Sequence, residues 1–231
     1  IDIPVLMNTA RHFKIEGPIR RILVLRPRAM GDVLLMTPAL RALRRGFPEA
    51  QIDVAVDDVL AGLLRRNPHI DRLWLFPLGP RRRPRQMWDL YHGLWQKRFD
   101  LVIDLHGSPR TAIATAITRA RHRVGYALRG RGRLYNIQVP RDTDREGHPR
   151  RLYAAQMNLE VVARCGLAGP ELENTDLVFE PEPEADEHWA REIAKLLPGS
   201  PRVGIAPAGT WQAKTAPPEL FARIADQLVQ N

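Results

Sequence analysis

One carboxylate, Asp32, stands where residue type and spacing suggest chemistry. It ends the run RAMGD (28–32), at the change from an apolar segment to a helical pattern, and no Asp or Glu follows for sixteen positions. Gly31 lets another molecule approach the backbone closely. In a cleft, such a carboxylate can act as a general base on a hydroxyl, but it can also simply interact with the helix dipole. Because neither GxxxxGK[ST] nor GxGxxG occurs, this is not a phosphate loop of those types.

A second candidate lies in GTWQAKTAPPELF (209–221), a predicted loop between a strand and a helix. It contains Thr210 and Lys214, and Pro217 stands near the first helical position, where its missing N–H does no harm. A hydroxyl, an ammonium group and the free N–H groups of a helix start suit a phosphate or diphosphate. A solvated lysine is the alternative interpretation.

A third candidate is the arginine cluster in GPRRRPRQ (79–86), whose Gly and Pro residues predict a loop. Its members are Arg81, Arg82, Arg83 and Arg85. Arginine can hold phosphates by paired hydrogen bonds, although a solvated charge run explains the cluster equally well. No aromatic residues alternate with these arginines, and no zinc-finger or RNP motif occurs, so nucleic acid is not a predicted partner.

Two histidines complete the candidates. His106 ends a predicted strand, beside a Gly, in DLHGSPR (104–110), and His148 begins a predicted helix in EGHPRRLY (146–153). Either can be an ordinary turn or cap residue. The absence of HxxxH or HExxH spacing predicts no metal site, and the single Cys165 cannot form an internal disulfide.

Composition is that of an ordinary globular protein, with 231 residues of which 44% are hydrophobic and 26% charged. No run of eighteen apolar residues and no signal-type segment occurs, which predicts a cytoplasmic protein. Residues 1–151 carry 29 Lys and Arg against 14 Asp and Glu, whereas residues 152–200 carry 3 against 10. A basic first part favours anionic partners, but Arg outnumbers Lys 31 to 4, which a GC-rich genome also produces.

The elements that must position these residues alternate between strands and helices. Short apolar runs predict buried strands at 21–25, 51–56, 72–76, 101–107 and 122–126. Helical spacing predicts one helix after the first strand, which ends at Gly46. It predicts further helices over 57–67, 109–119 and 149–164. This alternation predicts an α/β fold with a parallel sheet covered on both faces. Ligands bind at the carboxyl ends of such strands, where Asp32 and His106 both lie.

The predicted domain organisation has four parts. Residues 1–19 form a lead-in, 20–168 a domain, 169–200 an acidic, Pro-containing linker with a helix near 184–197, and 201–231 the start of a second domain. That start consists of a strand in RVGIAPAG (202–209) and a helix from 217 to 230. Because one strand and one helix cannot bury their apolar faces, we expect the second domain to be incomplete and the chain to belong to something longer.

The order of four segments resembles glycosyltransferase family 9, the ADP-heptose:lipopolysaccharide heptosyltransferases, from about Arg20 to the last residue. The segments are RILVLRPRAMGDVLLMTPALRALR, FDLVIDLHGSPRTA, EGHPRRLY and VGIAPAGTWQAKTAPPELFARIADQL. The MGD helix start and the pattern PxGTxxxKxxPxxxF are the most specific parts. The resemblance implies a GT-B fold, in which 20–168 is a Rossmann-like acceptor-binding domain and 201–231 begins a Rossmann-like nucleotide-sugar-binding domain.

The resemblance also implies residue roles. Asp32 would deprotonate the acceptor hydroxyl that attacks ADP-heptose with inversion. Thr210, Lys214 and Gly31 would contact the donor. Acceptor contacts would come from Arg81, Arg82, Arg83, Arg85, His106, Arg110 and His148.

The implied partners are a nucleotide-sugar donor and an anionic glycolipid acceptor at the inner membrane surface, without nucleic acid. We expect a cytoplasmic monomer, peripheral to the inner membrane. It would need no cofactor and no metal, since Lys and helix N-termini can stabilise a leaving diphosphate.

Two alternatives stay open. One is a family 9 transferase for a different sugar, and the other is a non-catalytic basic module that binds an anionic polymer or a membrane surface. We expect residues 1–231 alone to show little or no activity. An Asp32 side chain packed inside the protein, paired with an arginine and sealed from solvent, would contradict the catalytic interpretation.

Overall fold

The computed structural model describes residues 15–78, 84–141, 153–195, 203–205, 207 and 215–230. The chain divides into two compact units, Ile1–Glu182 and Pro183–Asn231. Unit 1 carries the candidate site, and each unit is described by itself.

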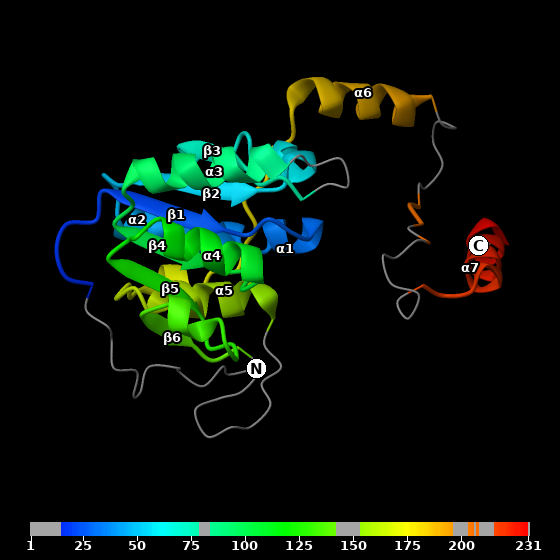
Figure 1. Cartoon of the computed structure of the whole chain (residues 1–231). Helices are drawn as coiled ribbons and strands as arrows, with labels where there is room; N and C mark the ends of the chain where they lie inside the picture. The colour runs from blue at the N-terminus through cyan, green and yellow to red at the C-terminus, as the bar shows by residue number, and fades with distance from the viewer. Residues whose placement is uncertain are drawn as a thin grey trace. The chain divides into compact units, whose positions relative to one another are not determined.

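Unit 1 contains a six-stranded parallel sheet in the order β3-β2-β1-β4-β5-β6 (Figure 1). The strands are β1 (Arg21–Leu25), β2 (Gln51–Val56), β3 (Arg72–Leu75), β4 (Leu101–Asp104), β5 (His122–Tyr126) and β6 (Ile137–Val139). The order reverses between β1 and β4, which pair directly, with Leu25 opposite Asp104. A crevice for ligands is expected outside the carboxyl ends at this reversal. The predicted α/β fold with a parallel sheet is confirmed.

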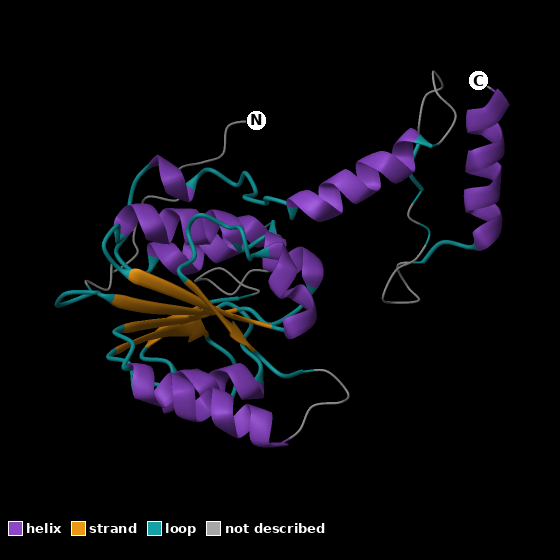
Figure 2. Ribbon diagram, turned by 90° about the horizontal axis from the view of Figure 1, so that it is seen from above, coloured by secondary structure: helices purple, strands orange, loops and turns teal. Residues whose placement is uncertain are grey.

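Helices cover both faces of the sheet (Figure 2). They are α1 (Met30–Leu34), α2 (Thr37–Gly46), α3 (Pro84–Lys97), α4 (Pro109–Ile117) and α5 (Ala154–Ala163), with short 3-10 helices η1 (Asp58–Leu63), η2 (Gly132–Leu134) and η3 (Pro170–Leu172). In β1, Ile22 and Val24 join the core that includes α2 and α5, while Leu23 and Leu25 join the core that includes α3 and α4. Both faces of the strand are therefore buried, which explains its continuous apolar sequence.

The single helix predicted after β1 is wrong, because the structure has two. Pro38 lies in the first turn of α2 and has no N–H to offer to the carbonyl of Leu34. The Thr37 hydroxyl donates to that carbonyl instead, at 2.8 Å. The second helix ends at Gly46, as predicted. The break leaves Asp32 on a short helix of its own at the rim of the sheet.

Other local predictions also need correction. The helix predicted over 57–67 is the 3-10 helix η1, over Asp58–Leu63. The loop predicted over 79–86 extends too far, because Arg85 and Gln86 already belong to the first turn of α3. Pro84 favours a loop, but proline is also favoured at the first position of a helix, which is where Pro84 lies in α3. The helix α3 and the edge strand β6 were not predicted.

Unit 2 contains two described helices, α6 (Pro183–Ala194) and α7 (Pro218–Gln230), close to their predicted bounds. The strand predicted over 202–209 is wrong for its described residues, 203–205 and 207, which have irregular structure. A strand needs a neighbouring strand as hydrogen-bond partner, and the described part of unit 2 contains none.

Part of the predicted linker, residues 174–178, belongs to unit 1 and packs against its helices. The Arg41 guanidinium donates to the carbonyls of Asn174 and Asp176 at 2.8 and 2.9 Å, and the Asn67 amide donates to the carbonyl of Val178 at 3.3 Å. These contacts attach residues 174–178 to the helical layer that contains α2. Across the described residues, no helix combines the length and the apolar character that a membrane span requires.

Candidate active site

The carboxylate of Asp32 lies in the first turn of α1, just beyond the carboxyl end of β1. Its Oδ2 accepts a hydrogen bond from the Ala29 backbone N–H at 3.3 Å and forms an ion pair with Nη2 of Arg26 at 2.8 Å. The Asp32 side chain is 40% exposed, against 11% for Arg26. Of the conditions that would contradict a catalytic role, one is met, because an arginine pairs with the Asp32 carboxylate. The other is not met, because solvent still reaches the carboxylate.

Arg26 joins the two loops that meet where the strand order reverses. While Nη2 pairs with Asp32, Nη1 donates to the backbone carbonyl of Leu105, directly after β4. Its Nε is buried and has no hydrogen-bond partner among the described residues. We did not single out Arg26 from the sequence, although a charged residue immediately after a fully buried strand was an available signal.

Arg28, from the same loop, contacts the other half of the sheet. Its Nε pairs with Oδ2 of Asp57 at 3.1 Å, and its Nη2 donates to the Leu78 carbonyl at 2.9 Å. Burial and the neighbouring Asp58 raise the pKa of Asp57, and Arg28 partly counteracts this rise. The loop that presents Asp32 is thus attached on both sides, to β4 through Arg26 and to the ends of β2 and β3 through Arg28.

The turn that carries His106 is built around Asp104, the last residue of β4. Oδ1 of this fully buried side chain accepts the backbone N–H groups of His106 and Gly107 at 2.9 and 2.8 Å, and the Tyr135 hydroxyl donates to Oδ2 at 2.7 Å. Burial raises the pKa of Asp104, and these hydrogen bonds limit the rise.

Glycine is required at position 107. Its φ is +71°, and an added Cβ would lie 2.7 Å from Cδ1 of Leu128. Asp104 and Gly107 together fix the turn that presents His106.

His106 shares an electrostatic environment with the ion pair. Burial is the largest cause that lowers its pKa, and the positive charge of Arg26 lowers it further, while Asp104 and Asp32 oppose the shift. The half-buried imidazole is therefore neutral at pH 7, and it can donate or accept one hydrogen bond at each ring nitrogen according to its tautomer.

We predict that the imidazole of His106 titrates below pH 6.5, its ordinary value. The unfolded chain binds the proton more readily, so stability from this group is fully present above about pH 6.5 and declines as pH falls towards the folded-state pKa. NMR titration of the histidine ring protons, assigned with a His106→Gln variant, checks the midpoint. Since burial also lowers the pKa of His69, the pH dependence of unfolding should be compared between wild type and His106→Gln.

The remaining described candidates lie near the same edge. An added Cβ at Gly31 would meet no atom within 4 Å, so the space beside the loop is open. Arg110 and Arg85 are exposed second residues of α4 and α3, and Arg85 forms an ion pair with Asp89 at 3.9 Å. In a parallel sheet, helices that follow strands begin at the carboxyl edge, so both arginines belong there with Asp32 and His106.

Several candidates lie outside the described residues, and their roles stay predictions: Arg81, Arg82, Arg83, His148, Thr210 and Lys214. Within the described part of the chain, no three His, Cys, Asp or Glu side chains are grouped so that they could hold a metal ion.

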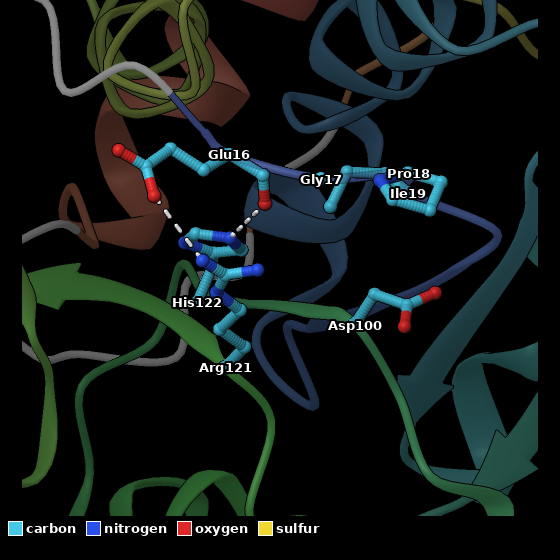
Figure 3. A pocket seen from close by; sticks show the side chains of 7 residues that line it. All are labelled: Glu16, Gly17, Pro18, Ile19, Asp100, Arg121 and His122. Carbon is cyan, nitrogen blue, oxygen red and sulfur yellow. Dashed lines mark hydrogen bonds and ion pairs between the residues drawn. The ribbon is translucent and has the colours of Figure 1, made fainter.

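A depression of about 190 Å³ lies at the opposite edge, beside the amino ends of β4 and β5 (Figure 3). Its polar groups contact one another: Glu16 pairs with Arg121 at 3.2 Å, and Nε2 of His122 lies 3.2 Å from the Glu16 carbonyl oxygen. Asp100 accepts the backbone N–H groups of Arg20 and Arg21. These contacts attach the segment before β1 to the sheet, and we assign them no catalytic role.

The strand order and the loops joined at its reversal define a Rossmann-like domain. Residues 87–231 match the family model described as glycosyltransferase family 9 (heptosyltransferase), and the chain belongs to this family. The expected family is confirmed.

Relatives and solved structures agree with this assignment. Lipopolysaccharide heptosyltransferase 2 of Escherichia coli K12 is 26% identical over 227 residues, covering 91% of this chain and 61% of the relative. Lipopolysaccharide heptosyltransferase 1 of Pseudomonas aeruginosa PAO1 is 25% identical, covering 91% and 58%. The chain thus spans about three fifths of the length of these relatives.

Two solved structures share the fold. A family 9 glycosyltransferase from Veillonella parvula has a TM-score of 0.73 at 23% identity, covering 91% of this chain and 59% of that one. The E. coli ADP-heptose lipopolysaccharide heptosyltransferase II has a TM-score of 0.67 at 24% identity, with coverages of 91% and 61%.

Proposed function

We propose that this chain supplies the acceptor domain of an inverting glycosyltransferase that transfers heptose from ADP-heptose to the inner core of lipopolysaccharide. The observation that carries the proposal is the position of Asp32: a partly exposed carboxylate at the reversal of strand order, in a loop held on both sides. Family membership and the names of the relatives support the reaction class and the sugar.

In the proposed mechanism, Asp32 acts as general base. Arg26 and the Ala29 N–H both contact Oδ2, so Oδ1 is the oxygen that takes the proton from the acceptor hydroxyl. The hydroxyl oxygen attacks the anomeric carbon of the donor from the face opposite the diphosphate. The bond between this carbon and the diphosphate oxygen breaks, and ADP leaves with the electron pair, which inverts the configuration. Arg26 keeps the carboxylate directed towards the edge of the sheet.

The other groups have binding roles in this proposal. Thr210 and Lys214, with the open backbone at Gly31, contact the donor and stabilise the charge on the leaving diphosphate, without a bound metal. Basic side chains contact phosphorylated core sugars. Three of them, Arg85, Arg110 and His106, lie at the carboxyl edge; the others are Arg81, Arg82, Arg83 and His148. The proposed protein is a monomer that works in the cytoplasm, at the inner face of the inner membrane.

The proposal is tested with a full-length protein that contains this chain. It is incubated with ADP-heptose and with lipid A that carries inner-core sugars, and mass spectrometry follows the acceptor while ADP release is measured. A gain of one heptose per acceptor is expected. Transfer only from a different nucleotide-sugar would assign another sugar specificity, and no transfer from any nucleotide-sugar would overturn the enzymatic proposal.

Residues 1–231 alone should transfer no detectable heptose in the same assay. The physical reason is that the described part of unit 2 contains helices but no strands, and a nucleotide-sugar pocket of this fold forms at the ends of strands. ADP-heptose titrated into the chain by calorimetry should accordingly produce no saturable heat. Robust transfer by the 231 residues would show that the donor site is complete in this chain.

A further inference from the structure

The outer surface of α3 and α4 carries large apolar side chains that meet solvent. Trp88 is 70% exposed and Trp95 42% exposed, on the side of α3 opposite the buried Leu90 and Leu94. The two helices pack side by side, and the Tyr91 hydroxyl donates to the Arg110 carbonyl at 3.2 Å. We call this surface the tryptophan face and define it by Arg85, Trp88, Trp95, Arg110, Ile113 and Arg119, all of which are exposed.

Positive groups accompany these apolar side chains. Arg119 lies over the ring of Trp95 at 5.1 Å, a cation–π contact, and the ring of His92 stacks on Trp95 with centroids 5.9 Å apart. Residues 84–98 and 109–119 together contain five Lys and Arg against one acidic residue, Asp89. The tryptophan face is therefore both apolar and cationic.

Among the described residues of unit 2, one tryptophan is exposed, and its surroundings carry the opposite charge. Trp189 in α6 is 61% exposed, and the same helix contains Glu184, Asp186 and Glu187 near it in sequence. Trp189 can therefore be compared with Trp88: the two side chains are similarly exposed, but the residues near Trp189 are negatively charged.

We infer that the tryptophan face docks on the surface of an anionic lipid bilayer. Indole rings favour the headgroup region, where one end of the ring is apolar and the other is wet, and arginines are attracted by anionic headgroups. Since α3 and α4 cover the same face of the sheet, docking turns that face of unit 1 towards the membrane surface. This inference concerns how unit 1 is held at a membrane, and it does not depend on the transfer reaction.

Two observations favour a bilayer over a nucleic acid. His92 and Arg119 already contact the ring of Trp95, which limits the ring surface on which a base could stack. The exposed aliphatic Ile113 on the neighbouring helix gains nothing from base stacking, but it gains from burial among glycerol and acyl groups.

The experiment uses the 231-residue chain and sedimentation with vesicles. One set of vesicles contains equal amounts of phosphatidylglycerol and phosphatidylcholine, and the other only phosphatidylcholine. The chain should bind the anionic vesicles, with a blue shift of tryptophan fluorescence, and should bind phosphatidylcholine much more weakly. Trp88→Ser should reduce the partition coefficient about tenfold, since the exposed ring loses its burial. Replacing Arg85 and Arg119 together by Gln should reduce it about 25-fold, at roughly fivefold per charge.

Matched variants control for composition and fold. Trp189→Ser removes an exposed tryptophan from acidic surroundings, and Arg65→Gln with Arg66→Gln removes two positive charges that are exposed elsewhere. Both controls should bind anionic vesicles like the wild type. Thermal unfolding of every variant confirms that the chain is folded.

Four results would overturn the inference. They are equal binding to both kinds of vesicle, unchanged binding by Trp88→Ser, equal loss in the control variants, and preferential binding of single-stranded DNA over vesicles. Self-association that Trp88→Ser abolishes, in a chain that ignores vesicles, would assign the tryptophan face to a second copy instead and would likewise reject the inference.

Discussion

Replacing Asp32 by Asn in a full-length protein should lower the rate of heptose transfer by about 100-fold or more, the scale on which loss of a general base acts. Asn keeps the size of the side chain and can still accept the Ala29 N–H, but it cannot take a proton from the acceptor hydroxyl. Initial rates at saturating donor and acceptor measure the effect. The Michaelis constants should change little, because the proposed role lies in the chemical step.

The variant must also be shown to fold. Asn removes one partner of the Arg26 ion pair, but Asp32 is 40% exposed, so solvent screening limits the expected loss to about 1 kcal/mol. Glu173→Gln, which removes an exposed carboxylate directly after η3, is a matched control and should keep full activity. Near-normal turnover by Asp32→Asn would refute the catalytic role.

Replacing Asp104 by Ala should lower the free energy of unfolding by about 2–4 kcal/mol, more than the other substitutions considered. Three donors, the backbone N–H groups of His106 and Gly107 and the Tyr135 hydroxyl, would lose their acceptor, and unsatisfied buried groups cost about 1–3 kcal/mol each. Removing a carboxyl group that is itself costly to bury offsets part of this loss. Urea unfolding measures the difference in free energy.

Asp104→Asn is the matched comparison. Its amide oxygen can still accept both backbone N–H groups, and its NH₂ group can donate to Tyr135, so the loss should stay near 1 kcal/mol. If Ala and Asn cost the same, the hydrogen bonds of this turn do not determine the stability of unit 1. Activity of the Asn variant in a full-length protein would further show how strongly transfer depends on the His106 turn.

The interior strands β1 and β2 could be predicted because burial on both faces gives them mostly apolar sequences, in Arg21–Leu25 and Gln51–Val56. The helix α3 was missed because Pro84 and the arginines before it indicated a loop. A signal was present in Met87, Leu90, Tyr91 and Leu94, whose spacing is helical and which pack in the core.

The surroundings of the candidate site could be predicted only in part. Asp32 and His106 were placed at strand ends by pattern alone, and the structure brings both to the carboxyl edge. The contact between Arg26 and the Leu105 carbonyl joins residues 79 positions apart, and the Asp104–Tyr135 hydrogen bond joins residues 31 apart. Pairings of this kind depend on which strands become neighbours, and a single sequence contains no local signal for them.

The bond from Arg26 to position 105 has an evolutionary consequence, because the acceptor belongs to the backbone. Every amino acid carries the same backbone carbonyl group, so a substitution at position 105 keeps this hydrogen bond. Which side chains are tolerated there depends on the core around Leu105. Homologues can therefore exchange one aliphatic side chain for another there while the two loops stay joined. A substitution of Arg26, in contrast, removes the donor of this hydrogen bond. Among homologues, position 105 should therefore vary more than position 26.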